Sequence, residues 1–165
     1  MIINKTGQLV EDFYSIGHPA IPVFLMDGVR PLIFDAGVAF LGEIYAGDIK
    51  KILGDRQVEY LFLTHAHFDH CGSVSILKKH FPLMKVITSK KAKDILGRPN
   101  AIKLIKALNR TSEEIAGDIE IDFALSGEFK QFEIDETVKD NDTFKISKGL
   151  NIRIIETQGH TAECL

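Results

Sequence analysis

The sequence predicts a single α/β domain. Short apolar runs of strand character alternate with helical patterns through the first part of the chain, and strand-like alternation returns near the end. A chain of 165 residues with 45% hydrophobic residues is long enough for one core. No internal repeat or low-complexity segment divides it. We therefore expect residues 1–165 to form one domain in which helices pack on a sheet.

Strands and one helix precede the most informative motif. Turn residues bound the first apolar runs, because Asp27-Gly28 is a strong two-residue hairpin signal and Pro31 suits a strand that begins near an edge or a bulge. Apolar positions at helical spacing then predict a helix that ends at Gly54. A β-branched and aromatic run predicts the next strand. In chain order, these elements are strands over 13–16, 23–26 and 32–34, a helix over 41–53 and a strand over 58–63.

Helices and further strands follow the motif. Ser89 can cap one helix, and Thr111 with Glu114 forms a capping-box pattern for another. Near the end of the chain, polar turns separate runs of period two. In chain order, these elements are a helix over 73–81, a strand over 84–87, helices over 89–96, over 100–108 and from 111 onward, and strands over 137–139, 144–146 and 150–157.

Four residues that can bind a metal follow the strand predicted over 58–63. They are His65, His67, Asp69 and His70. Strand side chains repeat with period two, so His65 and His67 leave the strand end on the same face. Asp69 continues that parity, whereas His70 can approach from a different direction. Neutral imidazoles and a carboxylate are the ligands of a catalytic zinc, which keeps one position open for water.

A fifth potential ligand follows the last predicted strand. This strand leads directly into Gln158-Gly159-His160-Thr161. Gly159 permits a tight turn that would direct His160 sideways from the sheet. Alone, such a histidine is more often structural. Because His65 and His67 need a third nitrogen to complete a zinc site, we expect His160 to supply it.

Cysteine content and the N-terminal sequence suggest a compartment. Cys71 and Cys164 are too few for a disulfide framework and suit a reducing cytoplasm. Each lies close to a histidine of interest, so a place in the metal pocket stays open beside the simpler role of a small buried residue. Residues 1–5 lack the basic start of a signal peptide, and no run approaches the ~18 apolar residues of a membrane span. We expect a cytoplasmic protein with no membrane partner, in which His18 and His80 are ordinary histidines.

The charge is unevenly distributed, although the net charge is only −3. Residues 78–110 hold ten Lys or Arg and one Asp, and residues 113–142 hold eleven acidic residues and two lysines. A basic stretch can attract phosphates. Here its lysines fall between apolar helical positions such as Ile102, Ile105 and Leu108, as on the solvated side of an amphipathic helix. We therefore expect no nucleic-acid partner.

These residues resemble the metallo-β-lactamase superfamily. Its three motifs are matched by His65-Ala66-His67-Phe68-Asp69-His70, Asp35-Ala36-Gly37 and Thr157-Gln158-Gly159-His160-Thr161. Gln158 replaces the usual proline, and Glu163-Cys164 stands where many members carry Gly-Ser. The resemblance implies a four-layer αββα sandwich with the site at one edge. Family members continue for several more strands and bring a bridging aspartate and a final histidine, so the resemblance implies a domain that lacks its C-terminal part and has an incomplete second half.

The resemblance also implies the site residues and an activity. His65, His67 and His160 would hold one ion, while Asp69 and His70 would help to hold a second. Zn²⁺ is the expected metal, with iron or manganese as alternatives. The implied reaction is hydrolysis by a metal-bound hydroxide that the catalytic Asp69 orients. The expected partner is a small-molecule substrate, namely an ester, a thioester or a lactone, and Asp35 would support the ligands.

Other functions remain open. A flavodiiron-type oxidoreductase has a similar fold but carries glutamate where His67 stands, which argues against it. A phosphodiesterase or nuclease of the same superfamily is supported only by the basic stretch 78–110. A non-catalytic fragment that binds at most one ion is the third alternative. The sequence does not predict the oligomeric state.

Overall fold

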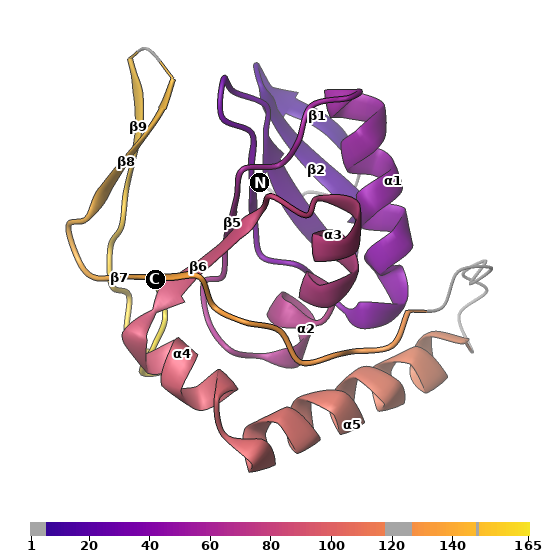
Figure 1. The fold of residues 1–165 in the computed structure, drawn as a ribbon. Helices are drawn as coiled ribbons and strands as arrows, with labels where there is room; N and C mark the ends of the chain where they lie inside the picture. Colours follow the sequence, from indigo (N-terminus) through magenta and orange to yellow (C-terminus); the bar gives the residue numbers. More distant parts are fainter. Residues whose placement is uncertain (1–5, 118–126, 148) are drawn as a thin grey trace.

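The computed structural model describes residues 6–117, 127–147 and 149–165. Within these residues, a seven-stranded sheet has the order β1-β2-β3-β4-β5-β6-β7 (Figure 1). Strands β1 to β4 pair antiparallel, and β4 to β7 pair parallel. The strands are β1 Gly7–Val10, β2 Phe13–His18, β3 Ile21–Met26, β4 Leu32–Phe34, β5 Tyr60–Phe62, β6 Lys85–Ser89 and β7 Glu136–Val138.

Helices cover one face of this sheet (Figure 1). Buried side chains from the strands, among them Leu25, Ile33 and Leu61, form the larger core with Tyr45 and Leu77 from the helices. Among the described residues, no helix combines the length and the apolar character that crossing a membrane requires. The helices are the 3₁₀ turn η1 Ala39–Leu41, α1 Gly42–Leu53, α2 Phe68–Cys71, α3 Val74–His80, α4 Lys90–Leu96 and α5 Pro99–Gly117.

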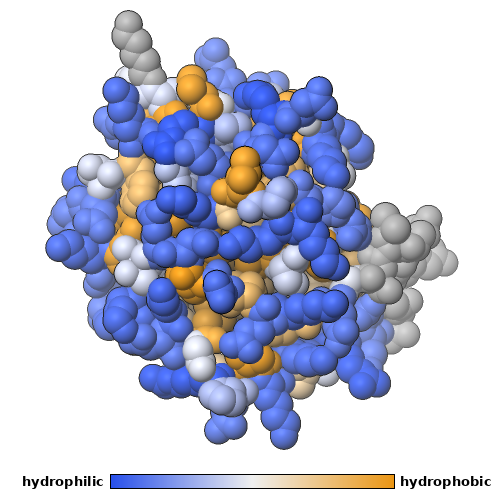
Figure 2. All heavy atoms as spheres, viewed as in Figure 1, coloured by the Kyte–Doolittle hydropathy of each residue, from blue (hydrophilic) through white to orange (hydrophobic). Residues whose placement is uncertain are grey.

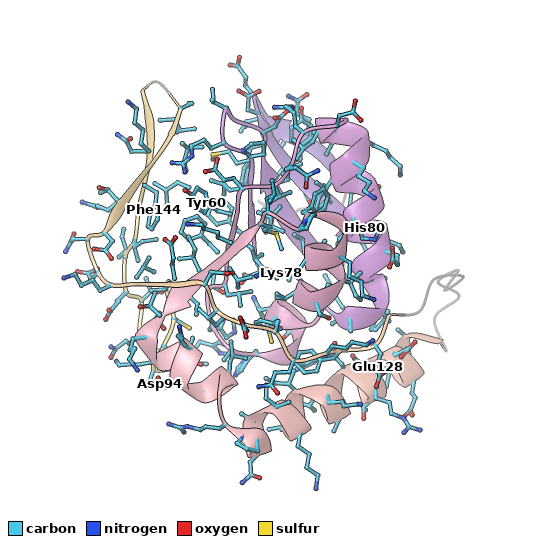
Figure 3. The ribbon with its side chains drawn as sticks, viewed as in Figure 1. Tyr60, Lys78, His80, Asp94, Glu128 and Phe144 are labelled. Carbon is cyan, nitrogen blue, oxygen red and sulfur yellow. The ribbon has the colours of Figure 1, made fainter. Side chains whose placement is uncertain are left out.

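A two-stranded hairpin packs on the other face of the sheet. It consists of β8 Thr143–Ser147 and β9 Leu150–Arg153. The ring centroid of Phe144 lies 6.1 Å from that of Tyr60 (Figure 3). It lies 5.1 Å from that of Phe62. Figure 1 shows no helix beyond this hairpin among the described residues. The described chain therefore has a helical layer, a large sheet and a small second sheet.

One predicted helix boundary is wrong. Residues 100–117 belong to the single helix α5, and Thr111 is an exposed residue within it and not a cap. The helix continues because Ile105, Asn109 and Ala116 lie on one buried face, so tertiary packing outweighs the local capping pattern. The predicted apolar face is also displaced, because Leu108 is 38% exposed whereas Asn109 is buried.

Other strand and turn predictions need smaller corrections. β1 was not predicted, because its side chains are mostly exposed and carry no apolar alternation. The connection between β3 and β4 spans residues 27–31, so Asp27-Gly28 lies within a longer loop. β9 ends at Arg153, four residues before the predicted end. The predicted cap at Ser89 is confirmed, since its Oγ accepts a hydrogen bond from Ala92 N at 3.1 Å.

Several lysines of the basic stretch form ion pairs with acidic side chains. Four pairs are Lys78–Asp135, Lys85–Glu136, Lys90–Asp94 and Lys106–Glu128, with N to O distances between 2.5 and 2.8 Å. Three of them join the basic stretch to the acidic stretch. The surface in the view of Figure 1 is mostly hydrophilic with separate hydrophobic patches (Figure 2). Residues 1–5 and the part of the acidic stretch from 118 to 126 lie outside the described residues.

Candidate metal centre

Two parallel strands deliver the site residues to one edge of the large sheet. Phe34 at the end of β4 pairs with Phe62 at the end of β5. Residues that follow these strands therefore meet at the same edge. Asp35 directly follows β4, and its N–H donates to Phe62 O at 2.8 Å. Asp35 has a φ of 59°, a left-handed conformation that aspartate adopts more readily than most residues. Its carboxylate thereby reaches Thr64, in the loop after β5.

His65, His67 and His160 converge at this edge. One ring nitrogen from each histidine lies within 4.8 Å of those of the other two. His160 Nε2 lies 3.1 Å from His67 Nδ1, and the ring centroids of His65 and His160 are 5.2 Å apart. More than 90 positions separate His160 from the other two histidines in the sequence, yet the fold brings the three rings together. Three imidazole nitrogens in this arrangement match the protein ligands of a three-histidine zinc site.

The buried ring of His65 is prepared to donate a lone pair. Thr64 Oγ1 donates its single proton to Asp35. The same oxygen lies 2.9 Å from His65 Nδ1, so in that contact it accepts a hydrogen bond from the ring N–H. Nε2 then carries the lone pair, and this buried atom has no hydrogen-bond partner among the described residues. Burial, with the nearby His70, lowers the pKa of His65 to about 4, so the ring is neutral at pH 7. An unpaired buried nitrogen costs about 1–3 kcal/mol. A divalent cation would satisfy it, so the residues present fit a metal ion.

Asp35 connects the site residues by hydrogen bonds. Its Oδ1 accepts from Thr64 N at 2.8 Å, and its Oδ2 lies 2.8 Å from His70 Nδ1. Burial alone would lower the pKa of His70, but the hydrogen bond and the charge of Asp35 raise it above the usual value. Asp35 therefore orients His70 directly and His65 through Thr64. This is the supporting position that the resemblance implies for Asp35.

Asp69 and His70 belong to α2 and lie beside the three histidines. The ring centroids of His65 and His70 are 4.0 Å apart, and His70 Nε2 lies 3.9 Å from Asp69 Oδ2. Within the described residues, the group with metal-binding geometry consists of His65, His67 and His160 alone. Binding of a second ion by Asp69 and His70 therefore stays a prediction, as does the catalytic role of Asp69.

The segment after β9 carries His160 to the site. Leu165 N donates to Thr64 O, in the loop after β5, at 3.0 Å. Ser89 Oγ, at the end of β6, donates to Glu163 O at 3.0 Å. His160 itself is exposed, in contrast to His65, which is only 5% exposed. The arm that carries His160 is thus held through its backbone, and its imidazole faces solvent.

Asn109 and Gly72 support the site but were not predicted to do so. Asn109 Oδ1 accepts from Ala39 N at 2.8 Å, and its Nδ2 donates to Phe68 O at 3.4 Å. A Cβ on Gly72 would lie 2.6 Å from both Ala39 N and Asn109 Oδ1, so only glycine permits this contact. Asn109 thereby holds α2 against the first residue of η1. The spacing of four residues from Ile105 is the only sequence signal for burial of Asn109, and it does not specify the partners of this side chain.

The cysteines and the remaining histidines lie outside the three-histidine group. Cys71 is buried, and burial raises the pKa of its thiol to about 12. Cys164 Sγ lies 2.9 Å from Thr161 Oγ1. His80 lies 2.7 Å from Glu43 Oε2 and 2.8 Å from Lys50 Nζ, and His18 Nδ1 accepts from the backbone of the following turn. These contacts agree with the expectation of ordinary histidines.

Comparisons of the sequence with known proteins agree with the resemblance. The family model of the metallo-β-lactamase superfamily matches residues 26–165. A metallo-β-lactamase fold-containing protein, ST1585, from Sulfurisphaera tokodaii is 29% identical over 141 residues, which cover 84% of this chain and 49% of that protein. The chain therefore spans about half the length of this relative.

Solved structures confirm the predicted fold class. A metallo-β-lactamase with a HARLDQ motif from Cronobacter sakazakii has a TM-score of 0.68 at 20% identity, covering 97% of this chain and 57% of that one. The subclass B3 enzyme BJP-1 from Bradyrhizobium japonicum has a TM-score of 0.69 at 20% identity, covering 96% and 54%. At such identities the likeness shows the fold alone. Since the family model matches most of the chain, including all three predicted motifs, the chain belongs to the metallo-β-lactamase superfamily.

Proposed function

We propose that this protein is a metal-dependent hydrolase that acts on a small ester, thioester or lactone. The observation that carries the proposal is the convergence of His65, His67 and His160, together with the unpaired, buried Nε2 of His65. Three imidazoles that meet at an accessible edge of the sheet are the donor set of a catalytic zinc site. The proposal extends to a second ion near Asp69 and His70.

Different residues of this chain would bind the metal, orient its ligands and transfer a proton. When bound, a divalent ion lowers the pKa of a bound water toward neutrality and polarises the carbonyl of a substrate. His65, His67 and His160 would hold that ion. Asp35 and Thr64 keep the His65 lone pair available. Asp69 is half-buried beside the cluster, where its carboxylate could orient the attacking water and accept its proton.

A phosphodiesterase is the second candidate, and the charge distribution argues against it. Several lysines of the stretch 78–110 already form ion pairs with carboxylates. The only aromatic residue of this stretch, Phe81, is buried and cannot stack on a base. These observations argue against a nucleic-acid substrate and leave a carbonyl compound as the first candidate.

Zinc-reconstituted protein tested against a substrate panel would decide between these functions. The panel consists of p-nitrophenyl acetate, an acyl thioester, a lactone and bis-p-nitrophenyl phosphate, and His67→Ala serves as the matched site variant. We expect zinc-dependent turnover of a carbonyl substrate that His67→Ala abolishes. Preferred cleavage of the phosphodiester would support the second candidate. Stoichiometric zinc without any turnover would instead identify a non-catalytic metal-binding protein.

A further inference from the structure

A cavity of about 240 Å³ lies at the carboxyl ends of two parallel strands. Ser89 ends β6 and Val138 ends β7, and both residues line the cavity. Figure 1 shows the C-terminal end of the chain beside these strands, and Glu163 and Cys164 from that end complete the buried part of the lining. Open α/β sheets commonly bind ligands outside the carboxyl ends of their strands. We call this hollow the β6–β7 cavity.

Glu163 brings an unpaired carboxylate to the lining of the β6–β7 cavity. The residue is only 7% exposed. Its backbone oxygen accepts from Ser89 Oγ, but its carboxylate has neither a hydrogen bond nor an ion pair with any other described residue. Glu156 also lines the cavity, but it is exposed to solvent. Burial of an unpaired carboxylate is costly, because water no longer stabilises its charge. A cationic group in the cavity would supply the missing partner.

Exposed lysines give the rest of the lining a positive charge. Lys90 is paired with Asp94, but Lys139 has no ion pair in the described part of the chain. Lys91 Nζ donates to Ala162 O at 3.2 Å, which uses one of its three donors. Lys91 and Lys139 can therefore bind an anionic group at the exposed side of the cavity. The cavity thus offers a negative charge in its buried part and positive charges in its exposed part.

We propose that the β6–β7 cavity binds the amino-acid end of a substrate whose scissile carbonyl lies at the metal centre, an inference that rests on the proposed hydrolase function. The ammonium group would pair with Glu163, and the carboxylate would pair with Lys91 and Lys139. Both charges of an α-amino acid thereby find a partner in one cavity. A substrate that lacks the ammonium group would leave Glu163 unpaired and would bind less tightly.

The cavity and the metal centre are close enough for one substrate. Three positions separate Glu163 from His160, so at most about 11 Å of extended backbone joins them. The same segment is bonded next to His65, because Leu165 N donates to Thr64 O. An acyl chain of several carbons can therefore connect a carbonyl at the histidines with an amino-acid group in the cavity.

Four methyl esters test the proposal on zinc-loaded protein. The ω-methyl ester of L-2-aminosuberate carries both charges, whereas monomethyl suberate lacks the ammonium group. Methyl 7-aminoheptanoate lacks the carboxylate, and methyl heptanoate lacks both groups. We expect kcat/KM for the aminosuberate ester to exceed that for each of the other esters at least about tenfold, because each of them loses a hydrogen bond between charged groups. An aminosuberate ester that is hydrolysed no faster than monomethyl suberate would overturn the proposal.

Glu163→Gln tests the assigned residue and keeps the size of its side chain. The variant should lower the preference for the aminosuberate ester over monomethyl suberate at least about tenfold, mainly through KM. Glu133→Gln is the matched control, since Glu133 is exposed and lies outside the cavity lining, and it should retain the preference. Lys139→Gln should weaken binding of both esters that carry a carboxylate. A preference that survives in Glu163→Gln would show that the assignment is wrong.

Binding of the reaction products separates a failure of this inference from a failure of the proposed function. L-2-aminosuberate and suberate are titrated into the isotope-labelled full chain, with zinc and without it, while NMR follows the amide signals of Ser89 and Val138. We expect L-2-aminosuberate to shift both signals at concentrations at least about tenfold lower than suberate. If none of the esters is hydrolysed, the hydrolase function fails and this titration alone decides. Equal affinities, or signals that do not shift, would overturn the role of the cavity.

Discussion

The two arms of the candidate metal centre are held in different ways. The His65 arm follows a buried parallel strand. Its ring donates a hydrogen bond to Thr64 Oγ1, and this hydroxyl in turn donates to Asp35. The His160 arm lies on a segment without regular structure, which backbone contacts at Thr64 and Ser89 hold in place. His65 is buried, whereas His160 is exposed.

This difference suggests that the His65 arm keeps the site rigid, whereas the His160 arm leaves it accessible to solvent. Ligands that are held by hydrogen bonds to a second layer of residues keep their orientation before the metal arrives. An exposed ligand on a less constrained segment leaves one side of the site open to water and substrate. We therefore expect metal affinity to depend most on the His65 arm, and less on the segment that carries His160.

Removal of one imidazole from each arm should give the largest effects. We expect His65→Ala to lower zinc affinity by more than about 100-fold, beyond the usual cost of changing a supporting residue. His160→Ala should cost less, because water can replace a ligand on the exposed side. Competition with a chromophoric chelator measures both affinities. His80→Ala is the control, since His80 lies outside the cluster, and equal losses in the two site variants would contradict the comparison.

Asp35→Asn should give the next largest effect. Asparagine also tolerates the left-handed backbone of this position, so the change removes the charge and keeps the fold. Zinc affinity should fall by about 10–100-fold, as is typical when a supporting carboxylate is lost. Glu163→Gln is the matched change on the other arm, where the described contact uses the backbone oxygen of Glu163. If both variants bind zinc as the unmodified chain does, the proposed importance of Asp35 is wrong.

Ser89→Ala tests how firmly the His160 arm is held. The substitution removes the cap of α4 and the bond to Glu163 O. The free energy of unfolding, measured with urea, should fall by about 1 kcal/mol, which is usual for a lost cap. Zinc affinity should fall less than in Asp35→Asn. Ser89→Thr retains the hydroxyl, so its free energy of unfolding and its zinc affinity should match those of the unmodified chain. If Ser89→Ala lost more zinc affinity than Asp35→Asn, the His160 arm would matter more than the His65 arm, contrary to the proposal.

Asp135 lies outside both arms and gives the smallest expected effect. Burial would raise the pKa of its carboxyl, but hydrogen bonds from Lys78 and from Val86 N lower it below the usual value. Its contribution to stability is therefore present above the unfolded pKa and is lost as the pH falls through the native pKa. Asp135→Asn should cost less than about 1 kcal/mol at pH 7, because the pair is partly exposed. Urea unfolding at pH 7 and at pH 3 measures the difference in free energy of unfolding between this variant and the unmodified chain. The difference should shrink at pH 3, and a larger difference there would contradict the expected pH dependence. Zinc affinity should not change.

Local sequence patterns predicted the elements of the fold better than the contacts between them. The period-two rule correctly predicted that His65 and His67 leave the strand end close together, because parity depends only on neighbouring residues. The capping pattern at Thr111 failed, since the buried side chains of α5 continue the helix through it. The bond between Asn109 and Ala39 joins residues 70 positions apart, and no local pattern specifies such a contact.

X-ray absorption at the zinc edge, on protein loaded with one equivalent of zinc, tests the three-histidine centre most directly. We expect a tightly bound ion with about three imidazole nitrogens at roughly 2.0–2.1 Å. The imidazole signal should decrease in His65→Ala and in His160→Ala. A sulfur ligand at about 2.3 Å would instead implicate Cys71 or Cys164. That result, or zinc that dialysis removes completely, would contradict a site built from His65, His67 and His160.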